Sequence, residues 1–314
     1  MERTEQIKVF ILTGFLGAGK TTMLNHILRM LRPYRNIVIE NEFGKVNIDT
    51  TLIAEKIDQV YELTSGCICC SLDNELLEAL DSVLRLPERP DHLFIETTGI
   101  ADAGNIIGMF QLPEVKARFQ LVKTICVADA ENVEERLEQV PEVGKQLSCA
   151  DLIVINKAAA LAVPELLRLH DLLKVINPLA EIVVSEEGKL QEKDLEPVAG
   201  VILPDQRPVA KSNATPHKIN SVLFESPYPF DMNMLMFVLD MHFNVYPEQL
   251  YRVKGYIAVK DREEKYLVQS TGKYMSIIPA GPWGNTSPSS TLVFIGKDLK
   301  TPTMQRILEP ALRK

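Results

Sequence analysis

The sequence predicts an α/β fold, in which a mainly parallel β-sheet is flanked by helices and followed by a smaller α+β domain. From the N-terminus to about residue 185, short β-branched runs alternate with helix-length amphipathic stretches, as in parallel strands joined by crossover helices. A proline-bearing stretch then interrupts this alternation. The chain has 314 residues, about twice the ~150 residues of an average domain, so we expect two domains.

The first predicted domain covers residues 1–199. Its strands are expected around seven apolar positions: Val9, Ile37, Val60, Leu93, Val122, Ile153 and Ile182. Its clearest helices are predicted over residues 23–31, 72–84 and 164–176, and Pro164 suits the first turn of the last helix. Because ligands of such sheets bind at the carboxyl ends of the strands, we expect the loops there to form the site.

A linker is predicted over residues 200–216, which contain three prolines. The second predicted domain, residues 217–314, has strand-like and helix-like runs. We expect strands over residues 219–224, 251–259, 266–269 and 292–295, and helices over residues 232–241 and 303–312. The first of these helices is rich in methionine; we expect it to face the core, although a client-binding surface is the alternative.

The composition argues against several classes of protein. The net charge is −8 and the basic residues are scattered, which does not suit a nucleic-acid partner. No apolar run approaches the ~20 residues of a membrane span, and residues 9–12 are too short for the core of a signal peptide. We therefore expect a cytoplasmic protein with no membrane partner, whose five cysteines stay reduced.

A glycine-rich loop directly follows the first predicted strand and precedes the first predicted helix. The residues that fit a phosphate-binding P-loop are Gly14, Gly17, Ala18, Gly19, Lys20, Thr21 and Thr22. In such a loop, backbone N–H groups converge on the phosphates, Lys20 neutralises β and γ oxygens, and the Thr21 hydroxyl coordinates Mg²⁺. The sequence therefore predicts a site for a nucleoside triphosphate.

Two acids and a glycine stand after other predicted strands. Glu96 ends an apolar run, as in a Walker B element, and is expected to hold the Mg²⁺ shell. Gly99 follows it and can bring its N–H to the γ-phosphate, so its loop can sense that phosphate. Glu42 has the location of a first switch loop and is a candidate metal ligand; a solvated surface acid is the alternative.

Three cysteines lie close together after the third predicted strand, at Cys67, Cys69 and Cys70. This spacing is poor patterning for a core and favours metal or redox chemistry. Thiolates select Zn²⁺ or Cu⁺, and three of them leave the fourth tetrahedral position open for Glu42 or an incoming ligand. A thiol–disulfide switch is the alternative. The isolated Cys126 and Cys149 are expected to be packing residues.

The ordered set of motifs resembles the CobW-like metallochaperone GTPases, relatives of the nickel-insertion GTPases of hydrogenase and urease maturation. After the P-loop come residues 40–44 (Glu-Asn-Glu-Phe-Gly), 66–70 (Gly-Cys-Ile-Cys-Cys), 96–99 (Glu-Thr-Thr-Gly), then Gln146, Ala150-Asp151 and Asn156-Lys157. This resemblance covers about residues 7–190. A weaker one to the family's C-terminal domain rests on residues 251–256, Trp283 and residues 292–296.

The resemblance implies that Asn156 and Lys157 help to bind GTP, that GTP shapes a metal site around the cysteines, and that hydrolysis releases Zn²⁺, or sometimes cobalt, to a client metalloprotein. One departure stands at the base-reading motif, where Ala159 replaces an expected aspartate. Loss of that charged acceptor is expected to cost about 1.5–3 kcal/mol, roughly tenfold to a hundredfold, in the preference for guanine over other bases. ATP is therefore not excluded.

Three functions compete on this basis. The leading hypothesis is a Mg²⁺-dependent GTPase with slow intrinsic turnover that carries metal to a client. A nucleotide-gated adaptor that docks a client metalloenzyme or corrinoid enzyme, without carrying metal, is the alternative. A small-molecule kinase is a third, but the cysteine cluster has no role in it. A homodimer is compatible with each of them.

Overall fold

The computed structural model of this chain describes residues 6–42, 59–64, 72–197, 218–245, 249–271 and 274–313. The chain divides into two compact units, the first formed by residues 1–169 with 180–198, the second by residues 170–179 with 199–314. The predicted linker lies outside the described residues, and our domain boundaries stay predictions. Among the helices in the described part of the chain, none is long and apolar enough to cross a membrane.

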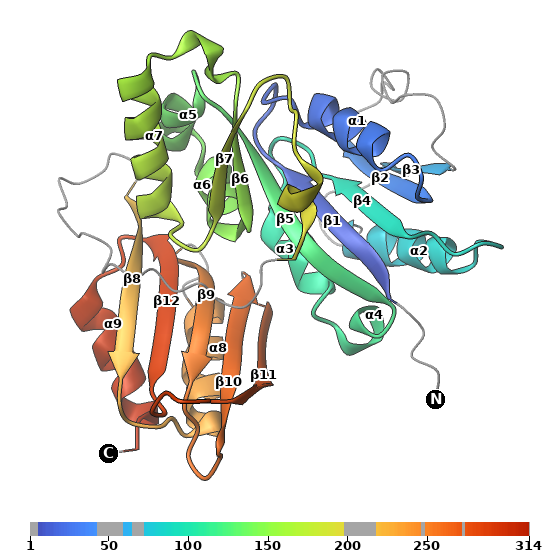
Figure 1. Cartoon of the computed structure of the whole chain (residues 1–314). Coiled ribbons are helices and arrows are strands. Elements are labelled where there is room, and N and C mark those ends of the chain that lie inside the picture. The colour runs from blue at the N-terminus through green and yellow to red at the C-terminus, as the bar shows by residue number, and fades with distance from the viewer. Residues whose placement is uncertain are drawn as a thin grey trace. The chain divides into compact units, whose positions relative to one another are not determined.

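The first unit is built on a seven-stranded sheet, counted over the described residues, with strand order β3-β2-β4-β1-β5-β6-β7 (Figure 1). Every neighbouring pair is parallel. The strands are β1 (Ile7–Thr13), β2 (Asn36–Glu42), β3 (Gln59–Thr64), β4 (His92–Glu96), β5 (Phe119–Asp129), β6 (Leu152–Asn156) and β7 (Glu181–Ser185). All seven strand positions predicted from the sequence are confirmed.

Helices follow most of these strands, as crossover connections require. They are α1 (Lys20–Met30), α2 (Leu72–Leu84), α3 (Ala103–Met109), α4 (Pro113–Lys116), α5 (Val133–Gln139), α6 (Pro141–Cys149) and α7 (Val163–Ile176), with the short 3-10 helices η1 (Ala158–Ala160) and η2 (Glu192–Leu195). The three helices predicted in this region are confirmed, although α1 begins three residues earlier than expected, at Lys20.

Both faces of the sheet are buried, which explains why its strands are continuous apolar runs. On β1, Val9 and Ile11 belong to a core cluster that includes side chains of α2 and α3. The alternate residues Phe10 and Leu12 belong to a second cluster with α1. Helices on both faces therefore leave the carboxyl ends of the strands as the open edge for a ligand.

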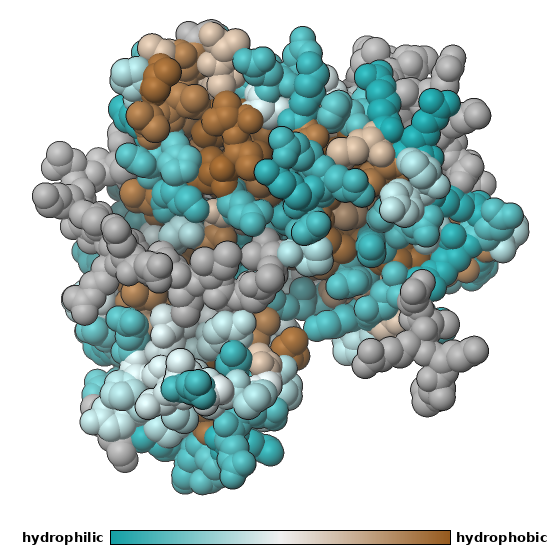
Figure 2. All heavy atoms as spheres, in the orientation of Figure 1, coloured by the Kyte–Doolittle hydropathy of each residue, from teal (hydrophilic) through white to brown (hydrophobic). Residues whose placement is uncertain are grey.

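One side of this unit carries apolar residues on its surface. Val163 and Leu167 on α7 and Val184 on β7 are exposed. Figure 2 shows apolar side chains gathered over this face of β7 and α7. Because β7 ends the strand order of the sheet, the patch lies at a sheet edge.

The second unit has a five-stranded antiparallel sheet, again counted over the described residues, in the order β11-β10-β9-β12-β8 (Figure 1). Its elements are β8 (Ile219–Ser226), α8 (Met232–Val245), β9 (Leu250–Ile257), β10 (Glu264–Thr271), β11 (Tyr274–Pro282), β12 (Ser290–Lys297), α9 (Thr301–Leu308) and η3 (Glu309–Ala311). The predicted α+β class is confirmed, and β11 is the strand that the sequence did not predict.

Helix α8 has two apolar faces. Leu235 and Leu239 are buried in the core of the second unit, as expected for a core-facing helix. Phe237, however, is 63% exposed, and three methionines of the same helix are also exposed: Met234, Met236 and Met241. The core-facing prediction is therefore right for only part of this helix.

Candidate nucleotide site

The P-loop connects the end of β1 to the start of α1 through backbone conformations that only glycine adopts easily. Gly14 has a φ of 136° and Gly19 a φ of 100°. A Cβ atom on Gly14 would lie 2.3 Å from the carbonyl oxygen of Val127, and one on Gly19 would lie 2.5 Å from Nδ2 of Asn156. Both glycines are therefore required by φ and by space, and they set the curve of the loop.

Lys20 is buried at the first position of α1. Its Nζ donates to the carbonyl oxygen of Gly14 at 3.0 Å and to that of Phe15 at 3.4 Å. The ammonium group thus lies within the curve of the P-loop. A positive charge at a helix N-terminus, surrounded by backbone N–H groups, suits the terminal phosphates of a nucleotide.

Thr21 and Glu96 come together across the loop. The Thr21 hydroxyl donates to Oε1 of Glu96 at 2.9 Å. The hydroxyl in the first turn of α1 and the carboxylate at the end of β4 are the hard oxygen donors that Mg²⁺ prefers, and the ion usually keeps several waters. The residues present therefore fit a magnesium ion beside the phosphates.

Gly99 lies directly against the P-loop. A Cβ atom on this residue would be 2.4 Å from the backbone nitrogen of Leu16, so no larger residue fits without a shift. Gln146 of α6 is fully buried and fixes the segment from Gly99 to Ala101 by hydrogen bonds. Its Nε2 donates to the carbonyl oxygen of Gly99 at 3.1 Å and to that of Ala101 at 3.3 Å. A change at the P-loop can therefore reach this segment by direct contact.

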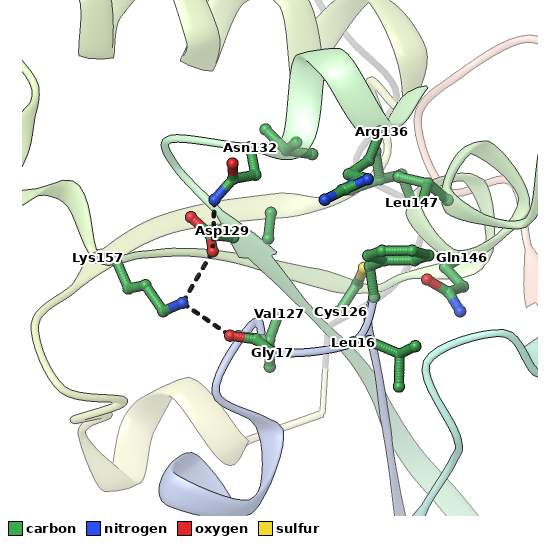
Figure 3. Close-up of a pocket in the computed structure, with 14 residues that line it drawn as sticks. Leu16, Gly17, Cys126, Val127, Asp129, Asn132, Arg136, Gln146, Leu147 and Lys157 are labelled. Atoms are coloured by element: carbon green, nitrogen blue, oxygen red, sulfur yellow. Dashed lines mark hydrogen bonds and ion pairs between the residues drawn. The ribbon is translucent and has the colours of Figure 1, made fainter. Parts of the chain in front are cut away.

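Asn156 and Lys157 hold the P-loop from the β6 side. Nδ2 of Asn156 donates to the carbonyl oxygen of Ala18 at 2.9 Å, and Nζ of Lys157 donates to that of Gly17 at 2.7 Å. Lys157 also forms an ion pair with Asp129 at 2.9 Å, as the dashed lines in Figure 3 show. These contacts bring together two motifs that lie about 140 residues apart in the sequence.

Asp129, at the end of β5, was not identified from the sequence. Burial raises its pKa, but hydrogen bonds from Lys157, Asn132 and the backbone of Glu131 outweigh burial and hold the pKa below its usual value. The carboxylate is therefore ionised at neutral pH and fixes the Lys157 ammonium. An acid directly after an apolar strand is the same signal that identified Glu96, so the sequence contained a sign of it.

A cavity of about 250 Å³ lies beside the P-loop, between β5, α5 and α6 (Figure 3). Cys126 lines it, and burial raises the pKa of this thiol to about 12, so it stays protonated and poorly nucleophilic. Cys126 and Cys149 are both buried, and neither takes part in a disulfide. Their prediction as packing residues fits this burial.

The predicted cargo-metal ligands are described only in part. Cys67, Cys69 and Cys70 lie outside the described residues, and of Glu42 the structure describes the backbone only, as the last residue of β2. Within the described ranges, no group of three His, Cys, Asp or Glu side chains is placed to hold a metal. The ligand set therefore stays a prediction.

Two protein-family models match successive parts of the chain. Residues 8–184 match the model of the CobW/HypB/UreG nucleotide-binding domain, and residues 219–312 match that of the cobalamin synthesis protein cobW C-terminal domain. Zinc chaperone YjiA of Escherichia coli is 35% identical over 303 residues, which cover 93% of this chain and 95% of YjiA.

The chain is also similar to a second relative and to a solved structure. The zinc-regulated GTPase metalloprotein activator 1 of Schizosaccharomyces pombe is 33% identical over 196 residues, covering 60% of this chain and 48% of that protein. The crystal structure of Zn(II)-bound YjiA GTPase from E. coli superimposes with a TM-score of 0.76 and 29% identity, covering 99% of this chain and all of that one.

Proposed function

This chain belongs to the CobW/HypB/UreG family, and on that basis we propose that it is a Mg²⁺-dependent GTPase that binds Zn²⁺ and delivers it to a client metalloprotein. The observation that carries the proposal is the contact between the P-loop and Gly99, which Gln146 holds in place. A segment in contact with the phosphate loop can respond to the presence of the γ-phosphate, as a metal switch requires.

Hydrolysis needs no covalent intermediate on the protein. A water molecule attacks the γ-phosphorus, a new P–O bond forms, and the bond to the bridging oxygen of GDP breaks. Lys20 and the P-loop N–H groups stabilise the charge on the transferred group. Thr21 and Glu96 would hold Mg²⁺, which supplies charge neutralisation when bound. We propose that intrinsic turnover is slow, and that the metal or the client stimulates it.

The cargo site is proposed to consist of Cys67, Cys69 and Cys70, with Glu42 or a client group in the fourth place. Glu42 is the Cα partner of Thr64 in the pairing of β2 with β3. Thr64 precedes Cys67 by three residues, so the chain can reach no more than about 11 Å between them. This proximity supports a shared site. YjiA is named a zinc chaperone and the S. pombe relative a zinc-regulated GTPase metalloprotein activator, which favours Zn²⁺ over cobalt as cargo.

The proposal is tested by the Zn²⁺ affinity of the reduced protein, measured by competition with a chromophoric chelator. We expect one Zn²⁺ per chain, bound more tightly with Mg²⁺ and a non-hydrolysable GTP analogue than with GDP. Replacing Cys67, Cys69 and Cys70 together by serine should abolish binding. The control Cys126→Ser, which changes a buried thiol elsewhere, should not.

The outcome that contradicts metal delivery is Zn²⁺ binding that is absent, or that survives the triple serine variant. In that case the nucleotide would gate an adaptor that docks a client without carrying metal. Binding that needs the cysteines but ignores the nucleotide would keep the metal site and remove the switch.

A further inference from the structure

The base-reading motif, residues 156–159, lacks the expected carboxylate because Ala159 stands at its last position. Two glutamates, Glu186 and Glu187, follow the neighbouring strand β7. The strands β6 and β7 are paired so that Asn156 and Ser185 are Cα partners. Neighbouring strands lie ~4.8 Å apart, so the segments that leave these two positions start side by side. The segment after Asn156 contains Ala159, and the segment after Ser185 begins with Glu186 and Glu187.

The turn after β7 is fixed to the rest of the proposed nucleotide site. The backbone N–H of Gly188 donates to Oδ1 of Asn156 at 3.2 Å. Nδ2 of the same amide donates to the carbonyl oxygen of Ala18 in the P-loop. A Cβ atom on Gly188 would lie 2.9 Å from Cα of Met23, so the turn also packs against α1. Ser185 Oγ closes the turn by donating to the carbonyl oxygen of Lys189 at 2.9 Å. Hydrogen bonds and packing therefore fix the position of this turn beside Asn156 and α1.

Glu187 has a defined place on the turn. Its φ is 55°, a left-handed conformation that costs a non-glycine residue free energy and that is frequent at ligand sites. Its carboxylate forms an ion pair with Lys189 at 2.9 Å, while the side chain remains exposed to solvent. The ion pair keeps the carboxylate on the turn without burying it.

We propose that Glu187 is the guanine-reading residue of this chain, and that its carboxylate accepts the hydrogen bonds from N1–H and the 2-amino group that an aspartate at position 159 would accept. The inference rests on the GTPase function proposed above. A carboxylate offers about four lone-pair sites, so the bond to Lys189 leaves acceptor capacity for the base. The hydrogen bond from Lys189 also lowers the pKa of Glu187, which keeps it ionised at neutral pH.

The test compares the affinities of the full-length, nucleotide-free protein for GDP, XDP and ADP, with mant-GDP as the fluorescent probe. We expect Glu187→Gln to weaken GDP binding by roughly tenfold to a hundredfold, the range for losing a charged acceptor. The same variant should gain affinity for XDP, because a glutamine amide can donate to the 2-carbonyl of xanthine. A loss of fold alone would not produce that gain.

Three matched variants separate base reading from structural effects. Lys189→Gln removes the same ion pair but keeps the carboxylate, and it should retain the GDP preference. Glu186→Gln changes the adjacent acid and should bind GDP like the wild type. Ala159→Asp, added to Glu187→Gln, should restore GDP binding, because it returns a carboxylate to the usual position.

Two results overturn the inference. One is a wild-type preference for GDP that survives in Glu187→Gln; the other is an equal loss of GDP affinity in Lys189→Gln or Glu186→Gln. Failure of the proposed function gives a different result, in which the wild type itself shows no preference for GDP over ADP.

Discussion

Asp129 supports the P-loop through the side chain of Lys157. It holds the ammonium of Lys157, which in turn donates to the carbonyl oxygen of Gly17. The side chain of Asp129 is 13% exposed and that of Lys157 is 46% exposed. The pair is therefore partly screened by water, and its contribution to stability belongs near the lower end of the range for charged hydrogen bonds.

We predict that Asp129→Asn lowers the free energy of unfolding by about 1 kcal/mol at pH 7. The pKa of Asp129 is lowered by folding, so its stabilising effect is complete above the unfolded value of about 3.9 and is lost as the pH falls through the folded value. Urea unfolding at pH 7, 5 and 3.5 should therefore show a constant difference between variant and wild type down to pH 5 and a smaller one at pH 3.5. A difference that does not change with pH would contradict this account.

The residues of the P-loop site differ in how far the sequence revealed them. Lys20, Thr21 and Glu96 belong to local motifs with fixed spacing, so their place follows from the sequence alone. Gln146 belongs to the set of motifs that resembles the family. Nothing in the sequence showed that its amide donates hydrogen bonds to Gly99 and Ala101, which lie 45 or more residues away in the chain. Long-range hydrogen bonds of this kind leave no periodic pattern.

Among the elements, β11 was missed because Pro279, Gly281 and Pro282 lie within it. Proline lacks the N–H that a central strand needs, but β11 ends the strand order of its sheet, and edge strands tolerate proline. Helices α3, α4 and α5 were missed because they have seven residues or fewer, too few for a clear helical period.

Lys123 is a buried charge that joins three elements of the first unit, β5, β7 and η2. It lies on β5 with its side chain 1% exposed, and its Nζ contacts Glu181 of β7 at 3.0 Å and the carbonyl oxygen of Asp194 in η2 at 2.9 Å. The Glu181 side chain is 46% exposed, so water can solvate it if the lysine is removed.

We predict that Lys123→Met costs about 1 kcal/mol in the free energy of unfolding. The methionine side chain fills the space of the lysine stem, and only the carbonyl oxygen of Asp194 loses its hydrogen-bond donor. Lys123→Ala should cost about 3 kcal/mol, because it also leaves a cavity. Chemical denaturation of the two variants measures both values. An equal cost for methionine and alanine would mean that the charge, rather than the packed stem, provides the stability.

Among the described residues, separate hydrophobic clusters lie on the two faces of the first sheet and in the second unit. The P-loop, Glu96, Asn156 and the turn at Gly188 all belong to the first unit. A nucleotide bound there stabilises the folded state of that unit by mass action, by about 2.7 kcal/mol at a hundredfold excess over Kd.

We predict that GDP with Mg²⁺ raises the melting temperature of the first unit by roughly 5–10 °C and leaves that of the second nearly unchanged. The chain provides a reporter for each unit. Cys126 is unreactive while buried, so its alkylation, followed by mass spectrometry, marks unfolding of the first unit. Trp283 is the single tryptophan of the chain, and its fluorescence reports on the second unit. Equal shifts at Cys126 and Trp283 would instead show that the two units unfold as one cooperative body, in which case the nucleotide would also stabilise the second domain.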